Sequence, residues 1–353
     1  MQRTSPQLVT TGLWLVVLAI SLYLLVIARD LLIPLVLAIF VWYLINLLAR
    51  QFGRIKLGGR QLPAGIQFLL AIAVTATVAG LFGKLITSNI NQVIETAPAY
   101  QENINRMITE NFERFGLEEP PALKSLIEGI NLASLIRNLA TALGGLMGNL
   151  GLITVYLVFL FLEQKFFRQK LRAIFPTEKQ FEVANHILTR IDRDVSIYLG
   201  IKIFVSALTG LISWGIMAAV GLDFAGFWAL LIFVLNFIPN IGSLVATTLP
   251  TLLALLQFDT LIPFMIIGIG VGTTQLVIGN LVEPPLMGRS LNISPLVVLL
   301  SLVLWGSMWG IPGMFLCVPI TVILMIILYQ FDSARWIALA LSKNGSVTPS
   351  DSN

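Results

Sequence analysis

Charged residues are scarce in this chain. They make up 11% of its 353 residues, whereas hydrophobic residues make up 57% and the mean hydropathy is +0.89. An ordinary soluble domain carries roughly 25% charged residues. A globule of this length with so few charges would expose large apolar patches to water. Lipid removes that difficulty because apolar side chains can face outward, so the composition excludes a soluble fold and predicts an integral membrane protein.

Cysteine and histidine are nearly absent as well. The single cysteine, Cys317, excludes an internal disulfide framework and a thiolate metal cluster. The single histidine, His186, excludes a multi-histidine metal site, and among polar neighbours it is expected to be solvated or packed. The sequence contains no Walker-type Gly-x-x-x-x-Gly-Lys-Ser/Thr motif. We therefore expect no cofactor, no metal and no ATP hydrolysis. The net charge of +4 fits cytoplasmic loop bias rather than a nucleic-acid partner.

Long apolar runs are what the sequence has in abundance. A bilayer core about 30 Å thick requires ~20 apolar residues per helix. Two apolar stretches, 224–257 and 294–329, are much longer than one straight span needs. We predict an all-α polytopic membrane protein with about eight membrane segments. The other segments are expected at 8–28, 31–49, 62–86, 146–162 and 198–220, with a Gly-rich helix near 261–282.

Both long stretches are broken near their centre by proline and glycine. The first break is Asn236–Gly242 and the second is Trp305–Gly313. Proline removes a backbone donor and glycine permits a reversal. Each stretch therefore forms either a re-entrant helical hairpin or a tilted, proline-kinked spanning helix. Because irregular backbone at membrane depth is tolerated only inside protein or around a wet cavity, paired interruptions point to a transport site.

Charged loops set the expected orientation. The loop after the second helix has four basic and no acidic residues, and the positive-inside rule places it in the cytoplasm together with the N-terminus. The segment 87–145 then lies outside; between Glu95 and Arg137 it carries seven acidic and four basic residues, with apolar residues at helical spacing. We predict a small helical extracytoplasmic insertion that caps the pathway, mediates assembly or is only structural. The C-terminus is cytoplasmic whether the long stretches span or re-enter.

These observations divide the chain into five parts. We predict N-terminal membrane helices (1–86), the extracytoplasmic insertion (87–145), a part that combines a membrane helix with a cytoplasmic amphipathic segment (146–197), a C-terminal transport core (198–332) and a cytoplasmic tail (333–353). The amphipathic segment is expected over 176–196, and the end of the tail is expected to be disordered.

Polar residues at membrane depth are costly and are candidates for function by default. Gln275, Asn280 and Glu283 follow one another on the Gly-rich helix and, at 100° per residue, share one broad face. Amides suit hydrogen bonds to a polyol-like solute or partial coordination of a small cation, and Glu283 is the natural proton or cation carrier. The alternatives are interhelical hydrogen bonds for the amides and an interfacial ion pair with Arg289 for the carboxylate.

Other polar and aromatic residues receive structural expectations. Lys202 and Asp223 stand near the two ends of the helix 198–220 and are expected to be boundary residues. Trp305 and Trp309, four residues apart, are expected to form a packing ridge or an interfacial anchor.

Four stretches resemble the signature of the autoinducer-2 exporter family of membrane transporters, the PerM-like permeases: FIPNIG (237–242), NLVEPPLMGRS (280–290), SPLVVLLSL (294–302) and WGSMWGIPGMFLCVP (305–319). The resemblance covers nearly the whole chain. It implies a bacterial inner-membrane transporter that forms a homo-oligomer. Some members are associated with export of autoinducer-2 and others with exchange of sodium or lithium for protons.

The polar breaks and the resemblance together give two sets of site residues. The candidate substrate or ion pathway comprises Asn236, Pro239, Asn240, Gly242, Gln275, Asn280, Glu283 and Arg289. The candidate structural hinges are Pro284, Gly288, Pro295, Gly306, Gly310, Gly313 and Pro319.

The leading functional hypothesis is a secondary transporter of the inner (plasma) membrane that exports a small polar solute such as autoinducer-2 with ion or proton coupling. A sodium (lithium)/proton antiporter is an alternative, for which Glu283 supplies the only nearby carboxylate. A membrane scaffold or assembly factor is the alternative from another class. We expect no enzyme, because the apolar stretches hold no histidine or carboxylate pair and Cys317 has no evident partner.

Overall fold

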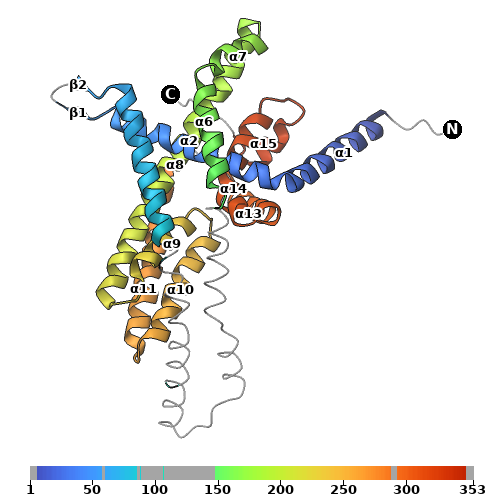
Figure 1. Cartoon of the computed structure of the whole chain (residues 1–353). Coiled ribbons are helices and arrows are strands. Elements are labelled where there is room, and N and C mark those ends of the chain that lie inside the picture. Colours follow the sequence, from blue (N-terminus) through green and yellow to red (C-terminus); the bar gives the residue numbers. More distant parts are fainter. Residues whose placement is uncertain are drawn as a thin grey trace.

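The computed structural model describes residues 6–57, 60–85, 88, 106, 148–287 and 292–346. Nearly all of that part is helical (Figure 1). The two-residue strands β1 (Lys56–Leu57) and β2 (Arg60–Gln61) pair antiparallel and form the only sheet among those residues. The predicted all-α polytopic architecture is confirmed. The predicted insertion at 87–145 lies outside the described residues, apart from Ser88 and Arg106.

The first half contributes long apolar helices. Helix α1 (Pro6–Ile27) leaves the body of the molecule and is followed, across a tight turn at Ala28, by α2 (Arg29–Phe52) (Figure 1). A further helix spans Ala64–Leu85, and α6 covers Leu150–Gln164. These elements agree with the predicted segments. Helix α7 (Phe167–Ile174) follows α6 after a bend of 66°.

A single helix, α8, runs without interruption for 43 residues, from Glu178 to Val220. The sequence predicts two helices here, a cytoplasmic one over 176–196 and a membrane one over 198–220. The structure joins them, because a change from polar to apolar side chains alters the environment of a helix without breaking its backbone hydrogen bonds. The helix ends where Gly221 adopts a positive φ of 82°; Gly221 donates its N–H to the Ala218 carbonyl and Leu222 donates its N–H to the Met217 carbonyl.

Four helices pack as an antiparallel bundle around a buried core. After α8 come α9 (Ala225–Leu235), α10 (Ile241–Gln257) and α11 (Leu261–Val277). A short π-helix, η1 (Ile278–Val282), and α12 (Glu283–Met287) continue α11. Small residues let these helices approach closely, as at Gly210, where an added Cβ would lie 2.9 Å from the carbonyl oxygen of Ala229. Fully buried Trp228 and Leu253 mark the centre of this bundle.

Both interrupted stretches reverse direction. The second consists of α13 (Pro295–Trp309) and α14 (Ile311–Leu328), whose antiparallel arms are joined by a hydrogen bond of 2.9 Å from Thr321 Oγ1 to Ser301 Oγ. The first consists of α9 and α10, which also lie side by side (Figure 1). Neither stretch is one kinked helix. The arms of the first, with 11 and 17 residues, are shorter than the ~20 residues of a full span, as a re-entrant hairpin requires.

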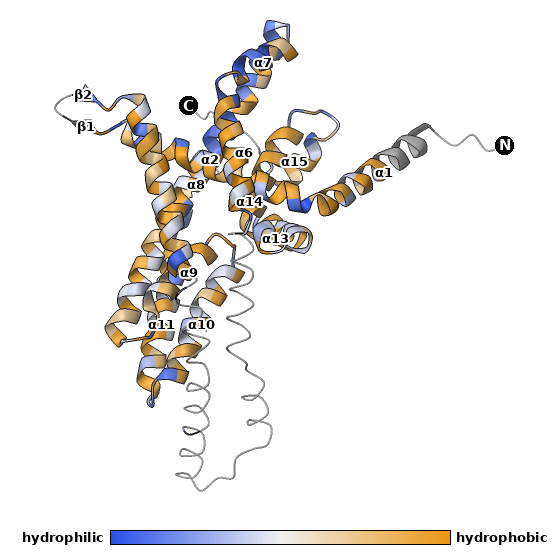
Figure 2. Cartoon of the chain, in the orientation of Figure 1, coloured by the Kyte–Doolittle hydropathy of each residue, from blue (hydrophilic) through white to orange (hydrophobic). Residues whose placement is uncertain are grey.

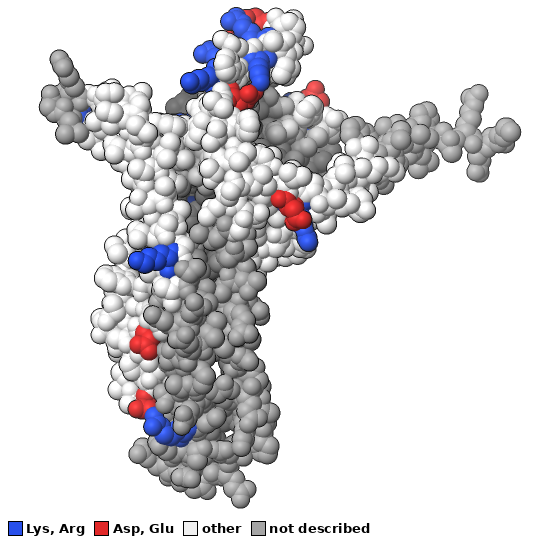
Figure 3. All heavy atoms as spheres, in the orientation of Figure 1, with Lys and Arg blue, Asp and Glu red and all other residues white. Residues whose placement is uncertain are grey.

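Length and composition mark five described helices as able to cross a membrane, or six if α6 and α7 count as one bent span. One of the five, α14, is an arm of the second interrupted stretch, and the other four match the predicted segments 31–49, 62–86, 198–220 and 261–282. Figure 2 shows apolar residues along most of the described helices. Large apolar side chains such as Leu69, Phe159 and Leu211 are exposed. In the view of Figure 3, charged side chains gather around α7 at one end, whereas the surface below is mostly uncharged. The chain is a multi-pass membrane protein.

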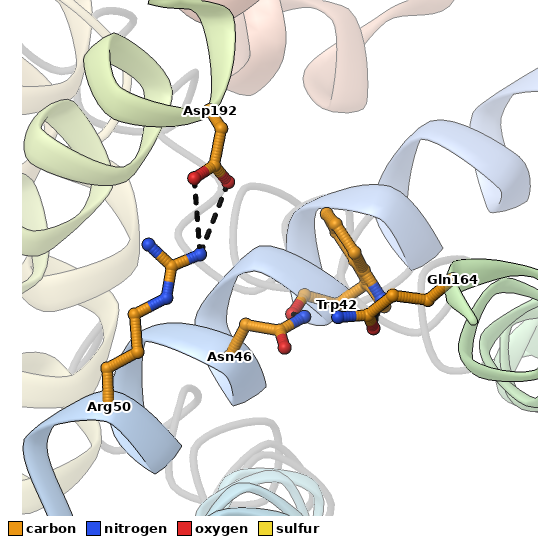
Figure 4. A network of polar contacts seen from close by, with 5 residues as sticks. All are labelled: Trp42, Asn46, Arg50, Gln164 and Asp192. Atoms are coloured by element: carbon orange, nitrogen blue, oxygen red, sulfur yellow. Dashed lines mark hydrogen bonds and ion pairs between the residues drawn. The ribbon is translucent and has the colours of Figure 1, made fainter. Parts of the chain in front are cut away.

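Polar contacts hold α2 between α6 and α8 (Figure 4). The Trp42 indole donates its Nε1–H to Gln164 Oε1 at 3.0 Å, and Arg50 Nη2 lies 3.3 Å from both carboxylate oxygens of Asp192. Asn46 points its amide back to the carbonyl of Trp42. These contacts bring the middle of α2 next to the end of α6 and the end of α2 next to the polar half of α8.

The C-terminal helix α15 (Arg335–Leu341) folds back onto the chain between α12 and α13. Ser294 donates its N–H to the Leu341 carbonyl at 3.0 Å, and Lys343 donates to the Asn292 carbonyl at 3.1 Å. This short antiparallel pairing fixes the start of α13, because Ser294 is its N-terminal flanking residue.

Candidate functional site

A cavity with a volume of about 750 Å³, lined by both polar and apolar side chains, lies between α8, the break separating α9 from α10, the start of α10, and the continuous α11, η1 and α12. One residue each from α13 and α14, Val298 and Val318, completes its wall. The structure brings six of the predicted pathway residues together on this cavity. They are Asn236, Pro239, Asn240, Gln275, Asn280 and Glu283.

The remaining predicted residues lie elsewhere. Gly242 is buried behind the first break and is not among the lining residues, and Arg289 falls outside the described residues. Among the predicted hinges, only Pro284 lines the cavity, and Gly288 is outside the described residues. The other hinges belong to the second hairpin: Pro295 begins α13, Gly306 lies in α13, Gly310 separates the two arms, and Gly313 and Pro319 lie in α14.

The first break contains a strained turn at the cavity wall. Ile241 donates its N–H to the Pro239 carbonyl at 2.6 Å, which closes a γ-turn around Asn240. Asn240 has φ 59° and ψ −57°, a combination that is rare and strained. Asparagine is one of the few residues other than glycine that visits positive φ. Such strain persists only where the surrounding fold over-determines it, and it clusters at ligand sites and switches.

Glycine closes both hairpins at a point of close backbone approach. A Cβ added to Gly242 would lie 1.8 Å from the carbonyl oxygen of Leu235, and one added to Gly313 would lie 1.9 Å from that of Trp305. No side chain fits at either place, since atoms cannot approach that closely. Just before these glycines, Asn240 and Gly310 both have positive φ. The two hairpins therefore share the same backbone arrangement at their reversals: a residue with positive φ is followed by a glycine that packs on the preceding helix.

The amides on the wall differ in how fully they are satisfied. Asn236 donates Nδ2 to Ser206 Oγ on α8 at 3.1 Å, and Asn280 donates Nδ2 to the Leu276 carbonyl at 3.0 Å. Gln275 is buried, and its Nε2 has no hydrogen-bond partner within the described part of the chain. Leaving a buried donor unsatisfied costs about 1–3 kcal/mol. Gln275 lines the cavity, but this nitrogen atom is covered, so the side chain must turn before the donor can meet an acceptor there.

The cavity holds an ion pair that the sequence does not predict. Lys202 Nζ lies 2.6 Å from Glu283 Oε1, and the two side chains are only 9% and 19% exposed. The expectation that Lys202 is a boundary residue is wrong: α8 continues well beyond it in both directions and places it on the cavity wall. The sequence did contain a signal for such a pair, because a lysine inside an apolar run needs a partner of opposite charge. Its partner is 81 residues away, so the pairing depends on tertiary packing.

The π-helix η1 lies between the predicted polar residues of the Gly-rich helix. Gln275 precedes η1, Asn280 lies within it and Glu283 follows it. A π-helical turn holds more residues than an α-helical turn, so the uniform 100° spacing behind the predicted face does not apply across this region. All three side chains nevertheless line the same cavity. Short π-helical segments occur frequently at functional sites.

Two aromatic residues of the second hairpin have a packing role. The Trp305 and Trp309 rings lie with centroids 5.0 Å apart, as the predicted packing ridge requires. The Trp309 indole also donates Nε1–H to the Leu25 carbonyl of α1 at 3.0 Å. The second hairpin is thereby attached to the projecting first helix. Elsewhere, His186 is exposed on α8, in agreement with a solvated role.

Apart from the paired Lys202 and Glu283, the described polar side chains on the wall are uncharged amides and hydroxyls. Such a surface can donate and accept hydrogen bonds without carrying net charge. Interrupted helices around a cavity with polar side chains on its wall, inside a multi-pass bundle with an apolar exterior, are the arrangement of a membrane transport protein.

Comparisons with known proteins agree with this class. The sequence matches the family model described as "AI-2E family transporter" over residues 15–332, and the chain belongs to this family. It is 33% identical over 319 residues to the AI-2 transport protein TqsA of Escherichia coli strain K12, covering 89% of this chain and 90% of that protein. The putative transport protein YhhT of the same strain is 31% identical over 298 residues, covering 83% of each chain. The putative permease PerM of that strain is 22% identical over 206 residues, covering 58% of this chain and 56% of that protein. The resemblance seen in the sequence motifs is thus confirmed.

Proposed function

We propose that the chain is a secondary transporter that exports a small, uncharged polar solute through the cavity between α8, the first hairpin and α11–α12. The observation that carries this proposal is the unsatisfied amide of Gln275, a residue buried on the wall of a cavity of about 750 Å³ that polar side chains help to line. Proteins do not ordinarily leave such a donor without a partner. Once this side chain turns toward the cavity, a hydroxyl or carbonyl oxygen of a passing solute supplies the missing acceptor.

The chemistry of the wall supports an autoinducer-2-like solute. Amides and hydroxyls bind a hydroxyl-rich molecule by hydrogen bonds, and TqsA is named an AI-2 transport protein. The sequence contains no Walker motif, so an ion or proton gradient is the proposed energy source. Sodium/proton antiport is less well supported, because Lys202 already occupies the Glu283 carboxylate. The proposal makes the chain a transporter and not an enzyme, in line with the names of its relatives.

The distribution of charge supports a location in a bacterial inner membrane with both termini in the cytoplasm. Basic residues of the loop after α2 and of α7 flank the ends of membrane helices, and the Arg50–Asp192 contact puts the end of α2 beside the polar half of α8. We also propose a homo-oligomer. Helix α1 projects from the body, and its exposed apolar residues, including Val16, Ile20 and Tyr23, offer a surface for a second copy (Figure 1).

Solute flux in proteoliposomes tests the proposal with Gln275→Met, which keeps the length of the side chain and removes the unsatisfied amide. The expected result is a loss of autoinducer-2 flux of about tenfold or more, the equivalent of one lost hydrogen bond to the solute at about 1.4 kcal/mol. The same variant should be more thermostable than the wild type, because a buried donor without a partner has been removed. Opposite changes in flux and stability would identify a residue that serves binding rather than folding.

Thr154→Val is the matched control. Thr154 lies exposed on α6, and its hydroxyl bonds only to the Leu150 carbonyl of its own helix. Flux in this variant should equal that of the wild type. Wild-type flux in Gln275→Met, together with lower stability, would show that the amide only holds helices together. Sodium-driven proton movement, measured in the same vesicles without solute, would instead favour the antiporter.

A further inference from the structure

We infer that Lys202 determines specificity: its ammonium group acts as a built-in counter-cation for Glu283, excludes free monovalent cations from the cavity and so restricts the site to uncharged solutes. This inference rests on the proposed function, because it names the substrate class of the same cavity. The contact that carries it is the distance of 2.6 Å between Lys202 Nζ and Glu283 Oε1 on the cavity wall.

Without the lysine, this wall would have the ligand chemistry of a cation site. A hard monovalent cation is held by carboxylate and amide oxygens. Glu283 supplies a carboxylate, and the amides of Asn236, Gln275 and Asn280 line the same cavity. The lysine ammonium occupies the position beside the carboxylate that a bound cation would take. An ammonium held in place by the protein does not lose translational freedom when it pairs with the carboxylate, whereas a free sodium ion does.

Burial makes the lysine the permanent partner of this carboxylate. Its side chain is 9% exposed, so little water reaches the ammonium to replace the carboxylate as its partner. An isolated lysine at this depth would be strongly unfavourable, and so would an isolated carboxylate. Each charge therefore stabilises the other, and the described wall keeps no net charge for a cation or an anion to neutralise.

The direct test is binding of radiolabelled sodium to the full-length protein in lipid nanodiscs. The wild type and Lys202→Arg, which keeps the positive charge, should show no saturable binding above a choline background. Lys202→Met should bind about one sodium ion per chain, since one unpaired carboxylate becomes available to a hard cation. The double variant Lys202→Met/Glu283→Gln should bind none, because the carboxylate is gone. Saturable sodium binding to the wild type that Glu283→Gln abolishes would overturn the inference, and so would a folded Lys202→Met that binds no sodium.

A second variant keeps the test decisive if Lys202→Met does not fold. Glu283→Ala removes the carboxylate and leaves space beside the ammonium, so formate should raise its melting temperature. Formate should have no such effect on the wild type or on Lys202→Met/Glu283→Ala. An absence of any formate effect on Glu283→Ala would contradict the role of the lysine. Both assays measure binding and do not depend on solute flux. The inference about Lys202 can therefore hold even if autoinducer-2 is not transported, and it can fail even if autoinducer-2 is transported.

Discussion

Replacing Gly313 by alanine should open the second hairpin. The new Cβ would lie 1.9 Å from the Trp305 carbonyl oxygen, whereas non-bonded atoms prefer about 3.5 Å, so the arms must separate by roughly 1.5 Å. Overpacking of this kind costs about 1–3 kcal/mol. The separation also breaks the Thr321–Ser301 hydrogen bond, which contributes about 1 kcal/mol. Alanine gains roughly 1 kcal/mol over glycine inside a helix, so the expected net loss of stability is about 1–3 kcal/mol.

Thermal unfolding in detergent micelles, followed by tryptophan fluorescence, measures this loss. At roughly 2 °C per kcal/mol for a chain of this size, Gly313→Ala should lower the midpoint by about 2–6 °C. Gly215→Ala is the control, because Gly215 is exposed on α8 and a Cβ there meets nothing within 4 Å. The control should keep or slightly raise the midpoint. Equal midpoints for the two alanine variants would refute the close approach of α14 to Trp305.

Substitutions at three further sites test other parts of the structure by the same unfolding assay. Asn240→Ala should be about 1–2 kcal/mol less stable than Asn240→Gly, because only the former carries a strained Cβ at φ 59°; equal stability would argue against the γ-turn. Lys202→Met should lose about 3 kcal/mol, and adding Glu283→Gln should recover most of it, whereas additive losses would mean that the two charges are not coupled. Arg50→Ala should change stability by at most about 1 kcal/mol, since its pair with Asp192 is exposed, and a larger loss would show that α2 depends on that contact.

Local signals made the two hairpins predictable. Proline and glycine interrupt each long apolar stretch, and their backbone requirements act within a few residues. The structure places its reversals at Asn240 and at Gly310, inside the predicted breaks. Local sequence signals did not show that α8 is one continuous helix. A change of composition near residue 197 indicates where the environment of a helix changes, but the backbone continues through it.

Tertiary contacts explain what the sequence could not reveal about the site. Lys202 and Glu283 lie on different helices, and their pairing depends on the antiparallel packing of α8 against α11 and α12. The π-helix further changes which way Glu283 points relative to Gln275, and π-helical turns have no reliable local sequence signal. The polar residues were predictable as a set because each is costly in lipid. Their partners were not, because a partner is defined by packing between distant segments.

Protection of the cavity by solute is the most direct test of the central claim that a polar solute occupies it. In a Cys317→Ser background, Thr248→Cys introduces a thiol on the cavity wall, and Thr154→Cys places one on the exposed surface of α6. Labelling of Thr248→Cys by a hydrophilic thiol reagent should slow as autoinducer-2 is added, with a saturable dependence on its concentration. The rate at Thr154→Cys should not change. A labelling rate at Thr248→Cys that is independent of the solute would contradict the account.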